Sequence, residues 1–147
     1  MNAAEVPPKG FDPRTFMSFV RDIGHIGAIG IAYHDHGADW VELALPYDEK
    51  LIGVEKSGII ASGPIISLMD VATSLAIWVR LDRFRHQATL DMRIDYLRPA
   101  TPGKVIYGRG ECYATTRSVG FVRGLAHDGD PLDPVAHVAA SFMFTGD

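Results

Sequence analysis

A narrow polar stripe crosses the otherwise apolar segment between residues 64 and 79. At about 100° per residue of helix, Ser67, Asp70 and Ser74 lie within roughly 60° of one another, and apolar side chains occupy nearly every other direction. Asp70 is the only charged residue of this segment. Because an ionised carboxylate near a core is costly unless protein groups, substrate or water meet it, the stripe predicts a reactive site centred on Asp70. The alternative is a thin exposed seam in which Asp70 only satisfies backbone donors.

The residues before the stripe form a start of small residues for the same helix. In the run Ser62-Gly63-Pro64, the proline is suited to the first helical turn. The free N–H groups of a first turn lie at the positive end of the helix dipole, where they can bind an anion or a developing oxyanion. Pro64 has no N–H, so Ser62 and Gly63 are the candidate donors. An ordinary N-cap is the alternative interpretation.

No other cluster predicts a chemical site. His34, Asp35, His36 and Asp39 fall in a short turn, where such residues are common for conformational reasons, so we expect no metal there. The remaining histidines are dispersed without ligand spacing, and no serine or cysteine occupies a nucleophile-elbow pattern. The single cysteine, Cys112, lies in an alternating strand pattern and is expected to be a small packed residue.

The segments before residue 46 predict a helix and a hairpin. An N-cap aspartate followed by proline indicates a helix over about 13–22. The apolar, β-leaning run 26–33 predicts a strand, with a turn at 34–37. Residues 40–45 alternate apolar and polar side chains, which is typical of a half-buried strand and completes the hairpin.

One long helix and a run of strands are predicted after residue 63. The helix begins at Pro64 and ends near Leu81. The strands are expected over about 90–96, 104–116, 120–127 and 135–145. Strands beside a segregated helix indicate an α+β domain.

In the strand after the long helix, the alternation of side chains places Thr89 on the outward face. This residue alternates with the outward polar residues Asp91 and Arg93 and not with the apolar Leu90 and Met92. Thr89 is therefore expected to reach a site only where that face meets a neighbouring subunit.

The composition indicates one globular domain over residues 1–147, with a loose polar leader at 1–10. The hydrophobic fraction of 47% supplies a core, and the net charge of −4 without a long basic run disfavours a nucleic-acid partner. The N-terminus lacks an apolar signal region, and we expect no segment with the roughly 20 apolar residues that cross a bilayer. Together these features predict a cytoplasmic protein without membrane contact.

The run Gly58-Ile59-Ile60-Ala61-Ser62-Gly63-Pro64-Ile65-Ile66-Ser67-Leu68-Met69-Asp70-Val71-Ala72 resembles the hotdog-fold acyl-CoA thioesterases, specifically the PaaI-type and 4-hydroxybenzoyl-CoA thioesterase branch. That family has His-Gly-Gly, an apolar helix start, and Asp or Glu nine residues after the His; Asp70 has this spacing from Ala61. Residues 88–100 look like the strand that follows the family's central helix. The resemblance covers about residues 20–145. It implies a hotdog fold, in which an antiparallel sheet of about five to six strands wraps one long helix.

The resemblance also implies a role for each matching residue. Asp70 would be the general base that activates water, or the nucleophile that attacks the thioester carbonyl. The Ser62 amide would polarise the thioester oxygen, Gly63 would let the backbone approach the acyl group, and Thr89 would help to hold the water. Substrate contacts are implied for Ala61, Glu55, Ser74, Arg98, Arg117 and Ser118, with the two arginines and Ser118 facing the coenzyme A phosphates. No cofactor is implied, because coenzyme A belongs to the substrate and water is the second reactant.

Three positions depart from the family pattern. Ala61 replaces its His, Ser62 replaces its first glycine, and Glu55 replaces an Asn common six residues before the His. These departures favour, as the alternative function, a non-catalytic hotdog module that binds an acyl thioester or a related small ligand. A hotdog dehydratase ranks last, because it would need a His where Ala61 stands. A homodimer or a dimer of dimers is expected, because one sheet over an apolar helix leaves edges to bury and because the family assembles in this way.

Overall fold

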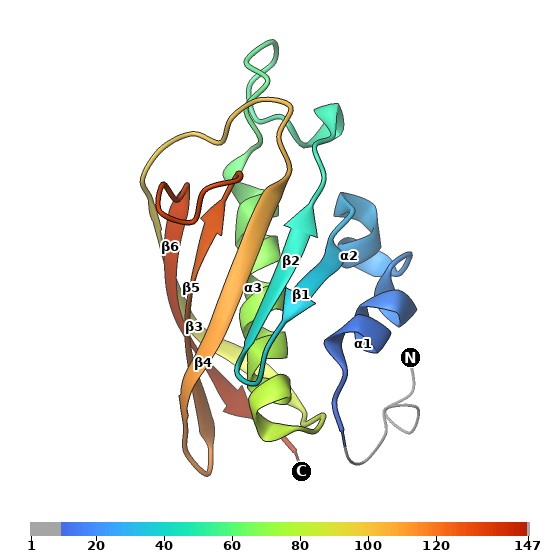
Figure 1. Cartoon of the computed structure of the whole chain (residues 1–147), viewed down its shortest axis with the longest axis vertical. Helices are drawn as coiled ribbons and strands as arrows, with labels where there is room; N and C mark the ends of the chain where they lie inside the picture. The colour runs from blue at the N-terminus through green and yellow to red at the C-terminus, as the bar shows by residue number, and fades with distance from the viewer. Residues whose placement is uncertain (1–9, 147) are drawn as a thin grey trace.

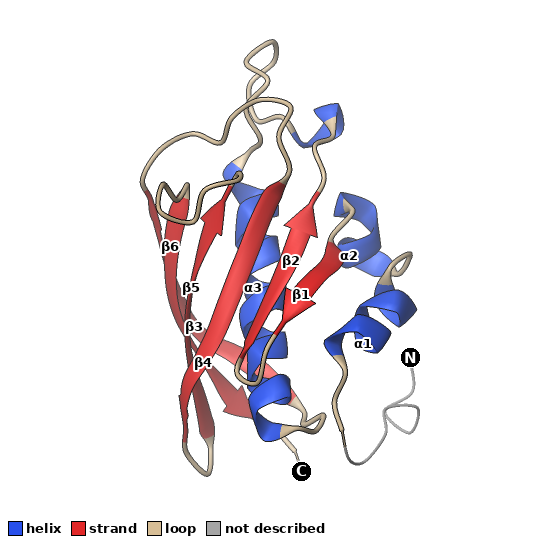
Figure 2. Ribbon diagram, viewed as in Figure 1, coloured by secondary structure: helices blue, strands red, loops and turns tan. Residues whose placement is uncertain are grey.

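The structure, a computed structural model, describes residues 10–146, in which one antiparallel sheet wraps a long helix (Figures 1 and 2). The expected leader lies almost wholly outside the described residues. The helices are α1 (Pro13–Val20), α2 (Gly24–Ile29) and α3 (Ser62–Leu81), with a 3-10 turn at Glu49–Leu51. The strands are β1 (Ala32–His36), β2 (Trp40–Leu45), β3 (Gln87–Tyr96), β4 (Ile106–Thr115), β5 (Val119–His127) and β6 (Ala136–Phe144). The predicted α+β hotdog architecture is confirmed.

The six strands follow the order β1-β2-β4-β5-β6-β3, so β1 and β3 are the two edges of the sheet. Every neighbouring pair is antiparallel. The sheet curves around α3, which lies behind β2 and β4 in the view of Figure 1. The edge strands therefore bound the part of α3 that the sheet leaves uncovered.

Glycines on the inner faces of β4 and β5 let α3 approach the sheet closely. A Cβ at Gly110 would lie 2.7 Å from the backbone N and Cα of Thr73, and a Cβ at Gly108 would lie 2.7 Å from Cγ of Leu68. Contacts this short would force the helix away from the strand. The glycines thus set the depth at which α3, and with it Asp70, sits in the curved sheet.

The apolar composition of α3 is explained by its packing against the sheet. Ser62–Leu81 is long and apolar enough to cross a membrane by length and composition, contrary to our expectation that no segment would be. Ten of its residues are buried, among them Leu68, Met69, Leu75 and Ile77 at 0% exposure. Apolar side chains in most directions are what a helix wrapped by a sheet requires. By itself, the same pattern is weak support for a membrane span.

The predicted hairpin is confirmed as the antiparallel pair of β1 and β2, but most of the predicted strand over 26–33 is wrong, because residues 24–29 form α2 and only Ala32 and Tyr33 of that run lie in β1. Ile26 and Ile29 of this short helix pack on the core, and Gly30 ends it in the left-handed region at φ 84°, with its N–H donating to the Ile26 carbonyl. A short apolar run shows too few repeats to distinguish a helix from a strand. In this segment the left-handed glycine cap favours the helix. Strand β1 includes His34 to His36, where the sequence predicts a turn.

Candidate active site

The polar stripe of α3 lies on the flank that the sheet leaves open. Ser67, Asp70 and Ser74 are half-buried, and Ile66 on the same side is 42% exposed. The residues around them on the other helix faces are buried. Asp70 is therefore reachable from solvent on a helix whose other faces are packed in the core.

Thr89 contacts Asp70 directly. The Thr89 hydroxyl donates a hydrogen bond of 2.8 Å to Oδ1 of Asp70. This bond joins the edge strand β3 to the middle of α3. The two side chains that sequence reasoning paired are thus brought together within one subunit.

A β-bulge explains why Thr89 faces the helix, and it corrects the expected alternation. The pairing between β3 and β6 shifts between Thr89, opposite Phe142, and Asp91, opposite Ser141. Opposite residues of an antiparallel pair project to the same face, and Phe142 is buried in the core. Thr89 therefore faces inward while Asp91 faces outward. A neighbouring subunit is not needed to turn Thr89 toward Asp70.

The residue inserted at the bulge is Leu90, an apolar residue that strict alternation with Met92 would place on the inner face. It is 52% exposed. An extra residue bends the strand and reorients the side chains next to it, which is how bulges commonly serve active sites. The bulge therefore turns Thr89 toward the helix and leaves the Leu90 side chain exposed to solvent.

Gln87 forms a second link between β3 and α3 that sequence reasoning missed. Its Nε2 donates a 2.9 Å hydrogen bond to the carbonyl of Ser74. Asp70 and Ser74 are separated by about 6 Å along the helix axis, which is about one turn. Thr89 and Gln87 are separated by about 6.6 Å along the strand, so the two hydrogen bonds can form side by side. Among the described residues, the buried Oε1 of Gln87 has no hydrogen-bond partner. Two parallel links hold Asp70 at a fixed depth beside β3.

The helix begins two residues earlier than predicted. Ala61 is the N-cap and makes no side-chain capping bond, so Ser62, Gly63 and Pro64 are the first three helical residues. The Ala61 N–H donates to the Leu51 carbonyl, whereas the Ser62 and Gly63 N–H groups have no acceptor four residues before them in the helix. Both residues are exposed. The two amides remain available donors two turns before Asp70.

Tyr96 marks the other end of the site. Its hydroxyl donates a 3.2 Å hydrogen bond to the carbonyl of Ser62, and burial raises the pKa of this phenol. Tyr96 ends β3, so the strand runs beside the open flank of α3 from the helix start to Ser74.

A histidine reaches the stripe from the opposite side. Nε2 of His25, in α2, lies 2.8 Å from the Ser67 hydroxyl. Sequence reasoning missed this residue, because no spacing pattern connects a histidine 42 residues away to Ser67.

Three of the predicted substrate contacts do not meet Asp70 within this chain. Glu55 is exposed in the loop between the 3-10 turn and α3. Arg117 and Ser118 occupy the β4–β5 turn at the lower end of Figure 1, where the Arg117 carbonyl accepts a 3.2 Å bond from Arg85. Arg85 follows the C-terminus of α3, about 16 Å of helix beyond Asp70.

Arg98 is engaged in an ion pair and not directed at the stripe. Its guanidinium donates to both carboxylate oxygens of Asp128, at 2.7 and 3.0 Å, and to Oδ1 of Asp133 at 3.2 Å. The Arg98 guanidinium holds the pKa of Asp128 well below its usual range. These contacts account for Arg98 without a coenzyme A phosphate.

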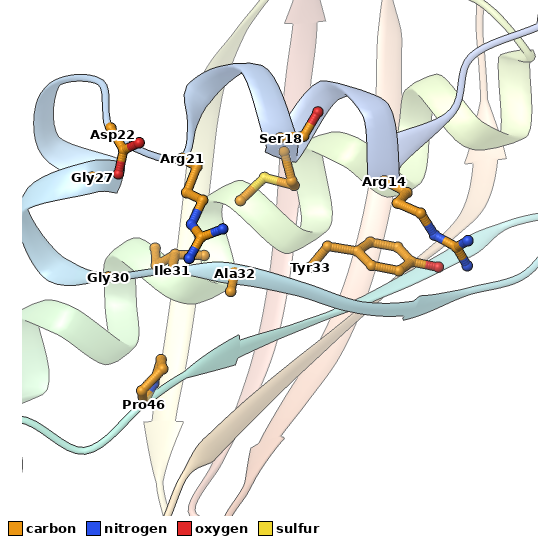
Figure 3. Close-up of a pocket in the computed structure, with 11 residues that line it drawn as sticks. Arg14, Ser18, Arg21, Asp22, Gly27, Gly30, Ile31, Ala32, Tyr33 and Pro46 are labelled. Carbon is orange, nitrogen blue, oxygen red and sulfur yellow. The ribbon is translucent and has the colours of Figure 1, made fainter.

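The histidines near residue 35 and a basic groove lie apart from the stripe. In residues 10–146, no three His, Cys, Asp or Glu side chains are placed to hold a metal ion, and His34 pairs with Glu42 at 2.9 Å. A groove of roughly 530 Å³ lies between α1, α2 and β1, and it is lined by Arg14 of α1 and by Arg21, which follows that helix (Figure 3). None of the stripe residues lines it.

Comparison with known proteins identifies the family. A family model described as the thioesterase superfamily matches residues 57–135. The solved structure of a Pseudomonas aeruginosa protein is 39% identical, with a TM-score of 0.77 over 88% of this chain and 94% of that one. A thioesterase of known structure from Haemophilus influenzae is 17% identical, with a TM-score of 0.81 over 95% of this chain and 94% of that chain, which shows a shared fold.

Two curated relatives match part of the chain. A candidate esterase from Halobacterium salinarum is 33% identical over 86 residues, which is 56% of this chain and 57% of the relative. A candidate esterase from Haemophilus influenzae is 29% identical over 80 residues, 54% of this chain and 56% of the relative. The chain thus spans little more than half the length of the curated relatives that it matches.

Proposed function

This chain belongs to the thioesterase superfamily, and from that membership we propose that it hydrolyses acyl- or aroyl-coenzyme A thioesters at the open flank of α3. The observation that carries the proposal is the hydrogen bond between Asp70 and Thr89, on a helix whose first turn has two free amides. A carboxylate next to a hydroxyl and an oxyanion-binding helix start is what water-dependent acyl transfer requires.

Asp70 activates the attacking water as a general base, or attacks the thioester carbonyl itself. The Thr89 hydroxyl donates to one carboxylate oxygen, which leaves the second oxygen free to meet water or the carbonyl carbon. The bond also restricts the rotation of the carboxylate, so that the reacting oxygen is oriented before substrate binds.

The Ser62 and Gly63 amides stabilise the oxyanion that forms on the thioester oxygen. Because Ser62 lies eight residues before Asp70, about 12 Å along the helix, the amides that meet a carbonyl at Asp70 come from the partner subunit of the dimer proposed below. Backbone donors at a helix N-terminus combine hydrogen bonding with the positive end of the helix dipole. Because the backbone provides these donors, the replacement of a family glycine by Ser62 leaves them in place. Water is the second reactant, so the reaction calls for no redox cofactor.

The hydroxyl of Thr89 is expected to contribute roughly ten- to a hundredfold to turnover. Thr89→Val keeps the shape of the side chain but removes the donor to Asp70, and a hydrogen bond to a charged group is worth roughly 1.5–3 kcal/mol. The readout is kcat/KM on the preferred thioester. Thr89→Ser, which keeps the hydroxyl, is the matched control and should retain most activity. Equal activity in the Val and Ser variants would remove Thr89 from the mechanism.

A homodimer completes the site in this proposal. Strand β3 is an edge with one unpaired side, and Leu90 and Tyr96 on it are 52% and 45% exposed. An edge of this kind pairs readily with another strand. A second copy seated on β3 covers these side chains and closes the open flank of α3. Glu55, Arg117 and Ser118 then meet the substrate only from the partner subunit.

Sedimentation at micromolar concentration is expected to show a dimer or a dimer of dimers. Leu90→Glu should weaken the association, because a charge on an edge strand opposes pairing. Leu132→Glu is the matched control, since Leu132 lies in the β5–β6 loop and is 94% exposed. A stable wild-type monomer would refute the dimer.

The function itself is tested by assaying a panel of acyl- and aroyl-coenzyme A thioesters with a thiol-trapping dye. Turnover of one or more thioesters is the expected result, and the best substrate identifies the acyl class. Tight coenzyme A binding without turnover, in a folded protein, would instead favour the non-catalytic binding module suggested by Ala61 and Glu55.

A further inference from the structure

The contact between His25 and Ser67 places an imidazole on the reactive stripe of α3. The two side chains are 2.8 Å apart, and His25 belongs to α2, just before the edge strand β1. Thr89 approaches the stripe from the opposite edge, β3. The stripe is thus flanked by a hydroxyl on one side and an imidazole on the other.

Ser67 and Asp70 are close enough for His25 to serve the same reaction. Residues three apart on a helix have Cβ atoms about 5–6 Å from each other on one face. A group hydrogen-bonded to Ser67 therefore lies within the reach of a substrate whose carbonyl meets Asp70. The free amides of Ser62 and Gly63 begin the same flank.

The backbone around His25 is tightly constrained. A Cβ at Gly27 would lie 2.6 Å from the carbonyl carbon of Asp22, so α2 folds directly onto the turn that precedes it. Gly30 closes the helix with its left-handed cap. The position of His25 over Ser67 is consequently set by backbone packing, although the imidazole itself is exposed.

We propose that His25, held by Ser67, is the proton donor to the departing coenzyme A thiolate, an inference that rests on the proposed thioester hydrolysis. When the tetrahedral intermediate collapses, the C–S bond breaks and sulfur takes its electron pair. The His25 imidazolium, whose Nε2 is held by Ser67, gives its Nδ1 proton to that sulfur and releases a neutral thiol. Asp70 has taken one proton from the attacking water, and that proton passes to solvent while His25 takes up another, so the net reaction is water plus thioester to acid plus thiol.

A proton donor from α2 fits the departure of this chain from its family pattern. The position at which the resemblance would place a histidine is Ala61, which has no titratable side chain. An imidazole exchanges protons near neutral pH more readily than any other side chain. His25 brings this chemistry to the stripe from a different element.

The test compares two leaving groups on the same acyl group. The substrates are the preferred coenzyme A thioester and the 4-nitrothiophenyl thioester of the same acid, whose thiolate leaves without protonation. His25→Gln is expected to lower kcat/KM roughly a hundredfold on the coenzyme A thioester, the low end of general acid catalysis, and to leave kcat/KM on the activated thioester within about twofold. Ser67→Ala should show the same selective loss in smaller degree. His137→Gln, an exposed histidine on β6, is the control and should change neither rate.

The outcomes separate this inference from the function on which it rests. Equal losses on both substrates, or no loss on either, would overturn the role of His25 while thioester hydrolysis stands. No turnover of any thioester by the wild-type protein would overturn the proposed function, and the role of His25 with it. Melting temperatures of the variants distinguish a chemical loss from unfolding.

Discussion

Asp70→Asn is expected to lower kcat/KM on the preferred thioester by a hundredfold or more. Asparagine fills the same space and can still accept a hydrogen bond from Thr89, but it cannot take a proton from water or form an anhydride with the acyl group. Because the carboxylate acts in the transition state, kcat should fall about as much as kcat/KM, with KM little changed.

Asp91→Asn is the matched control for this substitution. Asp91 is an exposed carboxylate two residues from Thr89, but the bulge directs it to the outer face of the sheet. Its variant should keep wild-type turnover. If Asp70→Asn were as active as Asp91→Asn, the fold and the family would stand, and the mechanism centred on Asp70 would not.

Arg98→Met is expected to reduce the free energy of unfolding by about 3 kcal/mol. Only 5% of the Asp128 side chain is exposed, and its carboxylate accepts two bonds from Arg98 and a 2.8 Å bond from the Thr101 N–H. Removing one partner of a buried pair leaves an uncompensated charge, which costs roughly 3–5 kcal/mol. Urea unfolding measures the loss.

Arg93→Met provides the control for the buried pair. Arg93 and Asp95 form an ion pair in which both side chains are more than half exposed, and such pairs contribute about 0–1 kcal/mol. Similar losses in the two variants would show that Arg98 and Asp128 are not a stabilising pair. If folded Arg98→Met raised the KM for the coenzyme A thioester more than Arg93→Met did, the result would support the contact between Arg98 and a coenzyme A phosphate that the resemblance implies.

The pair also gives a pH dependence of stability with a definite sign. Since hydrogen bonds from Arg98 lower the pKa of Asp128 in the folded state, the folded protein holds the proton less tightly than the unfolded chain. The stabilisation is fully present above the unfolded carboxyl pKa of about 3.9 and is lost as the pH falls through the folded value. Arg98→Met should therefore lose less stability than the wild type when the pH is lowered from about 5 to 2.

The sequence by itself determined the central helix, the strands that follow it, and Asp70 as the charge to explain. These features are visible in the spacing of polar and apolar residues along the chain. The stripe through Ser67 and Ser74 follows the helical repeat of 3.6 residues, and strands such as β2 follow a repeat of two residues. The small residues before Pro64 were sufficient to identify the helix start within two residues.

Tertiary structure decided how the site is assembled around Asp70. The bulge at Leu90 exists only in the pairing of β3 with β6, so no reading of β3 alone could show that Thr89 faces inward. The contacts of Gln87 and His25 with α3 depend on which edges of the sheet flank the helix. Segment 24–29 became a helix because a glycine cap and core contacts outweighed its β-leaning composition. The repeat of residues in one segment predicts which side chains share a face of its helix or strand. Which faces contact one another depends on strand register and long-range packing, because those contacts are made between segments distant in the chain.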